Sequence, residues 1–272
     1  MTAAATPIRF GLIIVGDEIL SAKREDKHLS KIIELLGARG LQLAWAHYIG
    51  DDRAALIQLY CRTFQSGDIV ISCGGIGATP DDHTRQAAAA ALGVRVSLHP
   101  EAGALISERC AEMARKGHGS ADMSTVENQQ RLKMGEFPVG AEIIPNPFNR
   151  IPGFSVRNHW FVPGFPVMAW PMVEWVLETH YARHFNTHLK VERSLIVFEV
   201  AESLLTPLME SIEQSYPGVR SFSLPSVGDG TDGKPARRHV ELGVRGAEAA
   251  LIEQAFAELR SAVLALGAEV AA

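Results

Sequence analysis

Three glycines and two aspartates lie close together in the segment Gly74-Gly75-Ile76-Gly77-Ala78-Thr79-Pro80-Asp81-Asp82, which we call the glycine loop. Glycines let a backbone approach a ligand closely and present its N–H groups to it. The loop follows an apolar run at 68–73 and opens the alanine-rich run 82–92, where a helix N-terminus would add partial positive charge. The glycine loop is therefore predicted to bind the phosphate of a small molecule.

A structural interpretation competes for the end of this loop. Thr79 fits the N-cap of a helix, Pro80 its first residue and Asp82 its third, which resembles a capping box with an acid in the usual Glu/Gln place. Capping alone does not require three glycines upstream, so ligand binding is favoured for the loop. For Asp81 and Asp82 individually, both interpretations stay open.

Acidic residues also follow the first two predicted strands. Gly16-Asp17-Glu18 ends the run 8–15, and Gly50-Asp51-Asp52 ends the run 41–49. Parallel strands end at one edge of a sheet, so these turns are expected near the glycine loop. Carboxylates would repel a bare phosphate, whereas a divalent cation between them would not, and Mg²⁺ is expected because the ligands are hard oxygens. The alternative is that each acid only caps a helix or a turn.

Other candidates carry weaker patterns. Pro163-Gly164-Phe165-Pro166 is a rigid turn before a helix, which could close over a ligand or merely end a strand. Cys73 ends a buried strand, and packing is expected there rather than a nucleophilic role. The histidines show no metal-ligand spacing.

The elements that must position these residues alternate along the chain. Strands are predicted at 8–15, 41–49 and 68–73, and helices at 27–39, 51–64 and 82–92, followed by a strand at 94–98 and a helix at 100–116. Such alternation is typical of βαβ units with a largely parallel sheet. In the irregular stretch that follows, only 142–144 and 160–162 are predicted as strands, and a helix runs from 166 to about 184. Long loops of this kind are often functional.

A second pattern begins near residue 186. A strand at 194–200, a helix at 204–216, strands at 219–227 and 239–244 around the hairpin 228–235, and a helix at 248–266 give the order β-α-β-β-α. The predicted domains are therefore an α/β domain at 1–185 and a small α+β domain at 186–272.

Composition is typical of a soluble globular protein, with 272 residues, 47% hydrophobic and 21% charged. The net charge of -5 predicts no basic stripe for nucleic acid. Three cysteines without metal or redox spacing indicate a reducing compartment. With no signal-peptide pattern and no apolar run of about 18 residues, a cytoplasmic protein without membrane contact is expected.

With these residues identified, the chain resembles the molybdopterin-binding (MoaB/Mog-like, MoCF biosynthesis) domain, in the form at the N-terminus of competence/damage-inducible CinA proteins. That family reads Thr-Gly-Gly-x-Gly-Pro-Thr-x-Asp-Asp-x-Thr at the loop, where this chain has Cys73 and Ala78 for the first Thr and the Pro. The likeness covers about 8–183. The tail is similar to the KH-like module of CinA proteins, and the C-terminal amidohydrolase domain of full-length CinA is expected to be absent from this chain.

The resemblance implies a three-layer α/β/α fold with a mostly parallel sheet, and a homo-oligomer, dimer or trimer. Mog-like relatives adenylylate molybdopterin with ATP and magnesium, whereas CinA-type domains are associated with metal-dependent cleavage of ADP-ribose. By position, Asp51 and Asp82 match the acidic pair, predicted here as catalytic residues and ligands of a divalent metal. The predicted ligand-binding residues are Gly16, Asp17, Glu18, Gly74, Gly75, Gly77, Thr79, Asp81, Thr84, Pro163 and Gly164.

The leading hypothesis is thus a metal-dependent nucleotide pyrophosphatase, acting on a nucleotide sugar such as ADP-ribose. The alternatives are a molybdopterin adenylyltransferase and a non-catalytic pterin or nucleotide-binding protein. Binding of RNA by the KH-like tail is not expected, because no Gly-x-x-Gly clamp lies between its helices.

Overall fold

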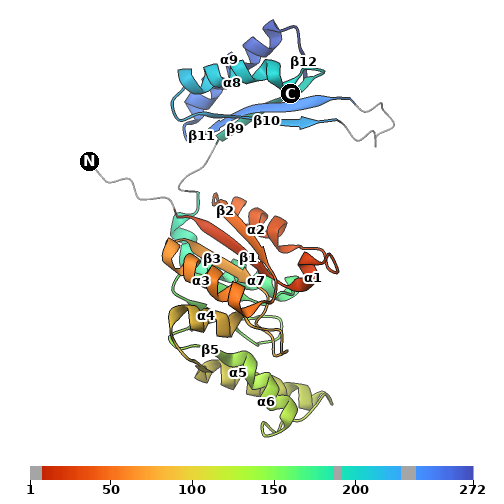
Figure 1. Cartoon of the computed structure of the whole chain (residues 1–272), viewed down its shortest axis with the longest axis vertical. Coiled ribbons are helices and arrows are strands. Elements are labelled where there is room, and N and C mark those ends of the chain that lie inside the picture. The colour runs from red at the N-terminus through yellow and green to blue at the C-terminus, as the bar shows by residue number, and fades with distance from the viewer. Residues whose placement is uncertain (1–7, 187–190, 228–236, 272) are drawn as a thin grey trace, which may run out of the picture. The chain divides into compact units, whose positions relative to one another are not determined.

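The computed structural model describes residues 8–186, 191–227 and 237–271, so the predicted hairpin tip at 228–235 lies outside the described residues. The chain divides into two compact units, Met1–Phe185 (unit 1) and Asn186–Ala272 (unit 2) (Figure 1). Each unit has hydrophobic cores of its own. In the described part of the chain, no helix is both long enough and apolar enough to span a bilayer.

Unit 1 is built on a six-stranded sheet. Its strands, in spatial order, are β2 (Leu43–Ile49), β1 (Phe10–Val15), β3 (Ile69–Cys73), β8 (His159–Val162), β7 (Gly153–Val156) and β6 (Glu142–Ile144). The first four run parallel, and the pairs β8–β7 and β7–β6 are antiparallel. Strands β1 and β3 are buried along their whole length because helices cover both faces of the sheet.

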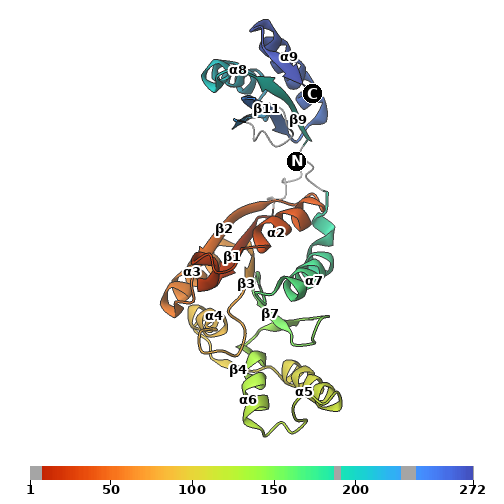
Figure 2. The same ribbon diagram turned by 90° about the vertical axis from the view of Figure 1, so that its right-hand side faces the viewer.

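Helices lie on both faces of this sheet (Figure 2). Helices α2 (His28–Gly37) and α7 (Pro166–Val176) pack on one face, around a core that includes Leu36 and Met172. Helices α3 (Arg53–Ser66) and α4 (Thr84–Leu92) pack on the other, around a core that includes Tyr60. The predicted three-layer α/β/α fold is confirmed. After α7 the chain continues as a π-helical turn, Leu177–Tyr181, and a 3-10 turn, Ala182–His184.

The stretch between α4 and β8 is more structured than predicted. The expected strand at 94–98 is β4 (Val96–Leu98), and it pairs with β5 (Glu136–Pro138) in a separate two-stranded sheet. Helix α5 (Pro100–Arg115) agrees with prediction, but α6 (Val126–Leu132), a 3-10 turn at Lys133–Gly135, β5 and β7 were not predicted. The one-turn helix α1 (Asp17–Leu20) was also missed. The missed helices have seven residues or fewer, which is too short to show a helical period of apolar residues.

Unit 2 is one antiparallel sheet with two helices. Its strands, in spatial order, are β10 (Arg220–Ser226), β11 (His239–Gly246), β9 (Val191–Phe198) and β12 (Glu269–Ala271), and its helices are α8 (Glu202–Ser215) and α9 (Ala249–Ala265). The predicted order β-α-β-β-α is confirmed, with β12 added after the last helix. Buried Leu242, Val197 and Leu259 lie in the core of this unit.

Candidate functional site

A cavity of about 520 Å³ lies where the four parallel strands of unit 1 end, and its volume is in the range usual for small-molecule sites, roughly 300–1,000 Å³. The predicted site residues that line it are Gly16, Glu18, Asp51, Gly74, Gly75, Gly77, Thr79, Asp81, Asp82, Pro163 and Gly164. Asp17 and Thr84 are not among the lining residues. Four turns that are far apart in sequence thus meet at one site because their strands are parallel neighbours.

The start of the glycine loop is held against the sheet. The Gly74 N–H donates to Val162 O at 3.0 Å, and the Thr84 hydroxyl, which is fully buried, donates to Gly74 O at 3.0 Å. A Cβ at Gly74 would lie 2.3 Å from Val15 O, and one at Gly75, where φ is +67°, would lie 2.3 Å from Thr84 Oγ1. Both positions therefore require glycine, and Thr84 braces the loop from behind.

The end of the loop is closed by Asp82. Its Oδ1 accepts from the Gly77 N–H and its Oδ2 from the Thr79 N–H, both at 2.9 Å, and the Thr79 hydroxyl donates to the same Oδ2. Helix α4 begins only at Thr84, and its N-cap residue, His83, makes no side-chain cap bond. The capping-box interpretation is therefore wrong: Asp82 shapes the loop and does not cap the helix.

A buried cation lies behind the same turn. The Arg85 side chain is 2% exposed and donates to Gly77 O. Its Nε and Nη1 have no hydrogen-bond partner within the described residues. Burial lowers the pKa of Arg85, while the charges of Asp82 and Glu136 raise it. Both the N–H and the C=O of Gly77 are thus engaged by the protein itself.

Three other amides of the loop remain available. The N–H groups of Gly75, Ile76 and Ala78 donate no hydrogen bond within the described part of the chain, and all three residues line the cavity. Successive free amides in a glycine-rich turn make an anion-binding concavity. The loop can therefore offer donors to phosphate oxygens without breaking any internal bond.

Acidic side chains face this loop from the ends of β1 and β2. The Asp17 N–H donates to Asp51 Oδ2 at 2.9 Å, and the Asp51 N–H donates to Asp17 Oδ1 at 3.3 Å. Partial burial raises the pKa of Asp51, the hydrogen bond from Asp17 lowers it, and the charges of Asp17, Glu18 and Asp81 raise it again. Such a carboxylate would be stabilised by a cation, so the site fits the predicted divalent metal in charge and in ligand type. In the described residues, no three His, Cys, Asp or Glu side chains form a metal site by themselves.

The next residue has a different role. Asp52 is the N-cap of α3, and its side chain accepts from the Ala55 N–H at 2.7 Å. The capping alternative thus holds for Asp52, which leaves the Asp51 carboxylate free to line the cavity.

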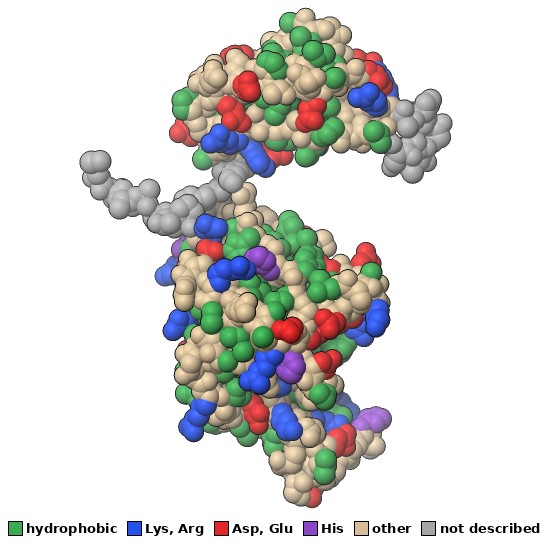
Figure 3. Space-filling view, in the orientation of Figure 1, with side chains coloured by type: hydrophobic (Ala, Val, Ile, Leu, Met, Phe, Trp, Pro, Cys, Tyr) green, Lys and Arg blue, Asp and Glu red, His purple; other side chains and the backbone are tan. Residues whose placement is uncertain are grey.

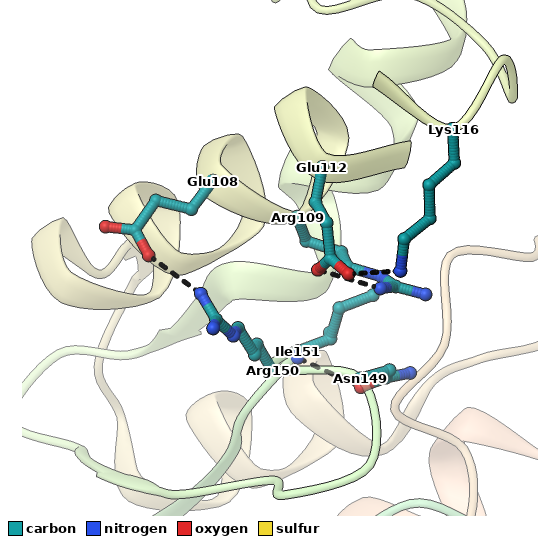
Figure 4. A network of polar contacts seen from close by, with 7 residues as sticks. All are labelled: Glu108, Arg109, Glu112, Lys116, Asn149, Arg150 and Ile151. Carbon is teal, nitrogen blue, oxygen red and sulfur yellow. Dashed lines mark hydrogen bonds and ion pairs between the residues drawn. The ribbon is translucent and has the colours of Figure 1, made fainter. Parts of the chain in front are cut away.

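The loop 146–152 lies in the irregular stretch whose long loops were expected to be functional, but none of its residues was predicted to bind the ligand. It supplies Asn146, Asn149, Ile151 and Pro152 to the lining. Buried Asn146 donates to Asn149 Oδ1 and to Ile151 O, both at 2.9 Å, so the loop is braced from within. Figure 4 shows the loop beside α5, where Arg150 pairs with Glu108 at 3.5 Å. The Asn and Pro residues of this loop were the available sign in the sequence that it is an ordered turn. Ile76, Ala78 and Phe165, which belong to predicted turns, also line the cavity, and the lining residues that were missed are Val15, Arg24, Met134 and Met168.

A second pocket of about 370 Å³ shares Val15, Glu18, Arg24 and Gly164 with the first. His28 lines it and bonds Gly164 O through Nε2 at 3.0 Å, which makes Nε2 the protonated nitrogen because a carbonyl only accepts. Cys73 is buried in β3, and burial raises the pKa of its thiol, so it is packed as expected.

Comparison with known proteins identifies the family to which most of unit 1 belongs. Residues 11–183 match the family described as "Probable molybdopterin binding domain". A "CinA-like protein" of Anaeromyxobacter sp. (strain Fw109-5) is 31% identical over 261 residues, which cover 88% of this chain and 59% of that protein. A "Putative competence-damage inducible protein" of Alkaliphilus metalliredigens (strain QYMF) is 26% identical over 221 residues, 78% of this chain and 50% of that protein.

The chain thus spans between half and three fifths of the length of these relatives. Among solved structures, the protein CinA "with unknown function" from Thermoplasma acidophilum has a TM-score of 0.53 at 24% identity, over 63% of this chain and 98% of that one. That likeness shows the fold of unit 1. By its sequence match over most of unit 1, the chain belongs to the probable molybdopterin-binding domain family, and CinA-like proteins are among its relatives.

Proposed function

We propose that unit 1 hydrolyses the pyrophosphate bond of a nucleotide sugar such as ADP-ribose. The observation that carries this proposal is the pairing of three free loop amides with a cluster of carboxylates on the lining of one cavity. Amides alone would suit a single phosphate, and carboxylates alone would repel it. Together they suit a diphosphate that binds with a divalent cation.

In this proposal Asp51 and Asp82 hold the cation, with Mg²⁺ as the first choice. The cation would supply positive charge to the diphosphate oxygens. Among the described residues, Asp51 Oδ1 accepts no hydrogen bond, whereas both oxygens of Asp82 accept bonds from the loop. Asp51 is thus the better cation ligand, and Asp82 chiefly keeps the amides of the loop in place.

The test is release of AMP and ribose 5-phosphate from ADP-ribose, with Mg²⁺, Mn²⁺ or Co²⁺ supplied in turn. Asp51→Asn is expected to abolish turnover, and Asp52→Asn, which keeps its cap because Asn also caps helices, is expected to retain it. Absence of turnover with all three metals in folded protein would contradict the proposal.

The family description, which names molybdopterin binding, favours a second candidate in which the same cavity binds a pterin without hydrolysing it. Related alternatives are that the cavity binds a nucleotide without hydrolysing it, or takes part in adenylylation of molybdopterin. Binding without catalysis predicts thermal stabilisation by the ligand and no turnover in either the native protein or the Asp51→Asn variant. Adenylylation predicts an ATP-dependent product on molybdopterin. A homo-oligomer in the cytoplasm remains our expectation, and sedimentation of the purified protein measures the subunit number.

A further inference from the structure

Phe165 is a large aromatic residue that is 53% exposed and lines the cavity. It precedes α7, and its carbonyl accepts from the Met168 N–H at 3.0 Å and from the Ala169 N–H at 2.9 Å. The first turn of α7 therefore fixes the backbone of Phe165, and its half-exposed ring is not explained by packing in the core.

Arg24 comes from a different segment and meets this ring. Its guanidinium carbon lies 5.8 Å from the centroid of the Phe165 ring, and it also lines the cavity. Its side chain forms no ion pair or hydrogen bond within the described residues. The backbone N–H of Arg24 donates to Glu18 O at 2.9 Å, which anchors the backbone of Arg24 to the turn after β1. An exposed pair at this distance contributes little to stability by itself.

The turn that carries Phe165 also contacts the glycine loop. A Cβ built on Gly164 would lie 3.5 Å from Gly74 Cα, and the Gly74 N–H is bonded to Val162 O. Gly164 and Phe165 are consecutive, so their Cα atoms are about 3.8 Å apart. A ligand whose phosphate is bound by the loop amides is therefore within reach of Phe165.

We propose that Phe165 and Arg24 bind the planar heteroaromatic ring of a phosphate-bearing ligand. The ring of the ligand stacks on the exposed face of the Phe165 ring. The planar guanidinium of Arg24 packs against the ring of the ligand next to Phe165. The inference rests on the phosphate-binding part of the proposed function and is independent of hydrolysis. It assigns the choice of ligand to two residues that belong neither to the glycine loop nor to the acidic turns.

The experiment compares two probes by titration calorimetry at fixed salt. AMP carries a phosphate and a ring, and ribose 5-phosphate carries the phosphate and sugar alone. We expect AMP to bind about tenfold more tightly than ribose 5-phosphate, as one stacked base would give. In Phe165→Leu the affinity for AMP should fall to that for ribose 5-phosphate, which should itself be unchanged, and Phe165→Trp should keep the preference for AMP.

The matched control is Phe148→Leu. Phe148 is 60% exposed and does not line the cavity, so its replacement should leave both affinities unchanged. Arg24→Gln should weaken binding of AMP more than that of ribose 5-phosphate. An equal loss for both probes would assign Arg24 to the phosphate and overturn its part of the proposal.

Equal affinities of the native protein for the two probes, or a preference for AMP that persists in Phe165→Leu, would overturn the inference. Failure of both probes to bind the native protein would overturn the phosphate site of the proposed function, and this inference with it. A preference for AMP that depends on Phe165, in protein that does not cleave ADP-ribose, would support the inference and contradict only the hydrolytic function.

Discussion

Asp51 lies near several other carboxylates at the cavity, whereas its neighbour in sequence, Asp52, has a structural role. The reciprocal bonds with Asp17 join the ends of β1 and β2, and Asp52 caps α3. Because the folded-state pKa of Asp51 is raised, its contribution to stability is most favourable at low pH and declines as pH rises past the ordinary range of an aspartate. A cation would offset this loss.

Asp51→Asn is accordingly expected to weaken binding of Mg²⁺ in the presence of ADP-ribose by tenfold or more, since even indirect supports of a metal are worth about that much. The readout is the Mg²⁺-dependent rise in unfolding temperature at neutral pH. Asp52→Asn should keep the full rise. If both variants respond to Mg²⁺ as the native protein does, Asp51 is not a ligand of the cation.

A second residue predicts how acid acts on unit 1. His159 is 1% exposed, its ring centroid is 4.1 Å from that of Phe64, and its Nε2 shares a hydrogen bond with Thr63 Oγ1 at 2.8 Å. Burial, and to a lesser extent the charge of Arg157, lower the pKa of His159 to about 3. The unfolded chain binds this proton near pH 6.5, so stability is full above that pH and falls as pH decreases from 6.5 toward 3.

By pH 4.5 the loss from this residue amounts to about 3 kcal/mol, since one pKa unit corresponds to about 1.4 kcal/mol. Urea unfolding followed by tryptophan fluorescence at several pH values measures it. His159→Gln should flatten the decline between pH 6.5 and 4.5, and His118→Gln is the matched control at an exposed position. A decline of unchanged steepness in His159→Gln would assign the acid sensitivity to other groups.

At the scale of elements, the glycine loop is fixed by close contacts with α4 and β1. Gly75 and Gly93 have the same φ of +67°, but a Cβ at Gly75 would meet Thr84, whereas one at Gly93 would meet nothing within 4 Å. Both substitutions by Ala carry the cost of a left-handed backbone, about 1–2 kcal/mol. Only Gly75→Ala must also move the loop.

We therefore expect Gly75→Ala to weaken binding of ribose 5-phosphate at least tenfold and Gly93→Ala to leave it unchanged, as measured by calorimetry. Both variants should unfold at lower temperature than the native protein. An equal affinity of the two variants for the probe would show that the shape of the loop does not control binding of the phosphate.

The elements that could be predicted from the sequence are those whose own residues show a clear pattern of apolar positions. Buried strands such as Phe10–Val15 and helices of nine or more residues needed only their own residues, and the parallel topology then predicted which turns meet. The start of α4 was misjudged because Asp82 has the spacing of a cap but turns back to Gly77. The loop 146–152 was missed because its polar residues bond one another, which no spacing rule reports.

At the scale of the whole molecule, the two units differ in the spectroscopic signals that report their unfolding. All four tryptophans of the chain belong to unit 1, so tryptophan fluorescence reports that unit, whereas circular dichroism reports helices of both. Lys and Arg side chains are interspersed with acidic and apolar ones on the face of the molecule in Figure 3, and they form no basic stripe there.

Leu242→Ala is expected to destabilise unit 2 by about 2–5 kcal/mol, because Leu242 is fully buried in its core. Leu264→Ala, at a leucine that is 47% exposed, should destabilise unit 2 far less than Leu242→Ala. If the units unfold independently, Leu242→Ala lowers the midpoint temperature of an unfolding transition seen by circular dichroism. The midpoint of the transition seen by fluorescence then stays unchanged. A fluorescence transition that moves by the same amount would show one cooperative molecule.

The segment 96–152 leaves the parallel sheet after α4, yet it supplies Met134, Asn146, Asn149 and Ile151 to the cavity. The groups that we propose to face phosphate come instead from turns at the ends of the parallel strands. Because Arg24 and Phe165 lie outside this segment, exchanging it with that of a relative should reshape one wall of the cavity and leave the preference for AMP over ribose 5-phosphate in place.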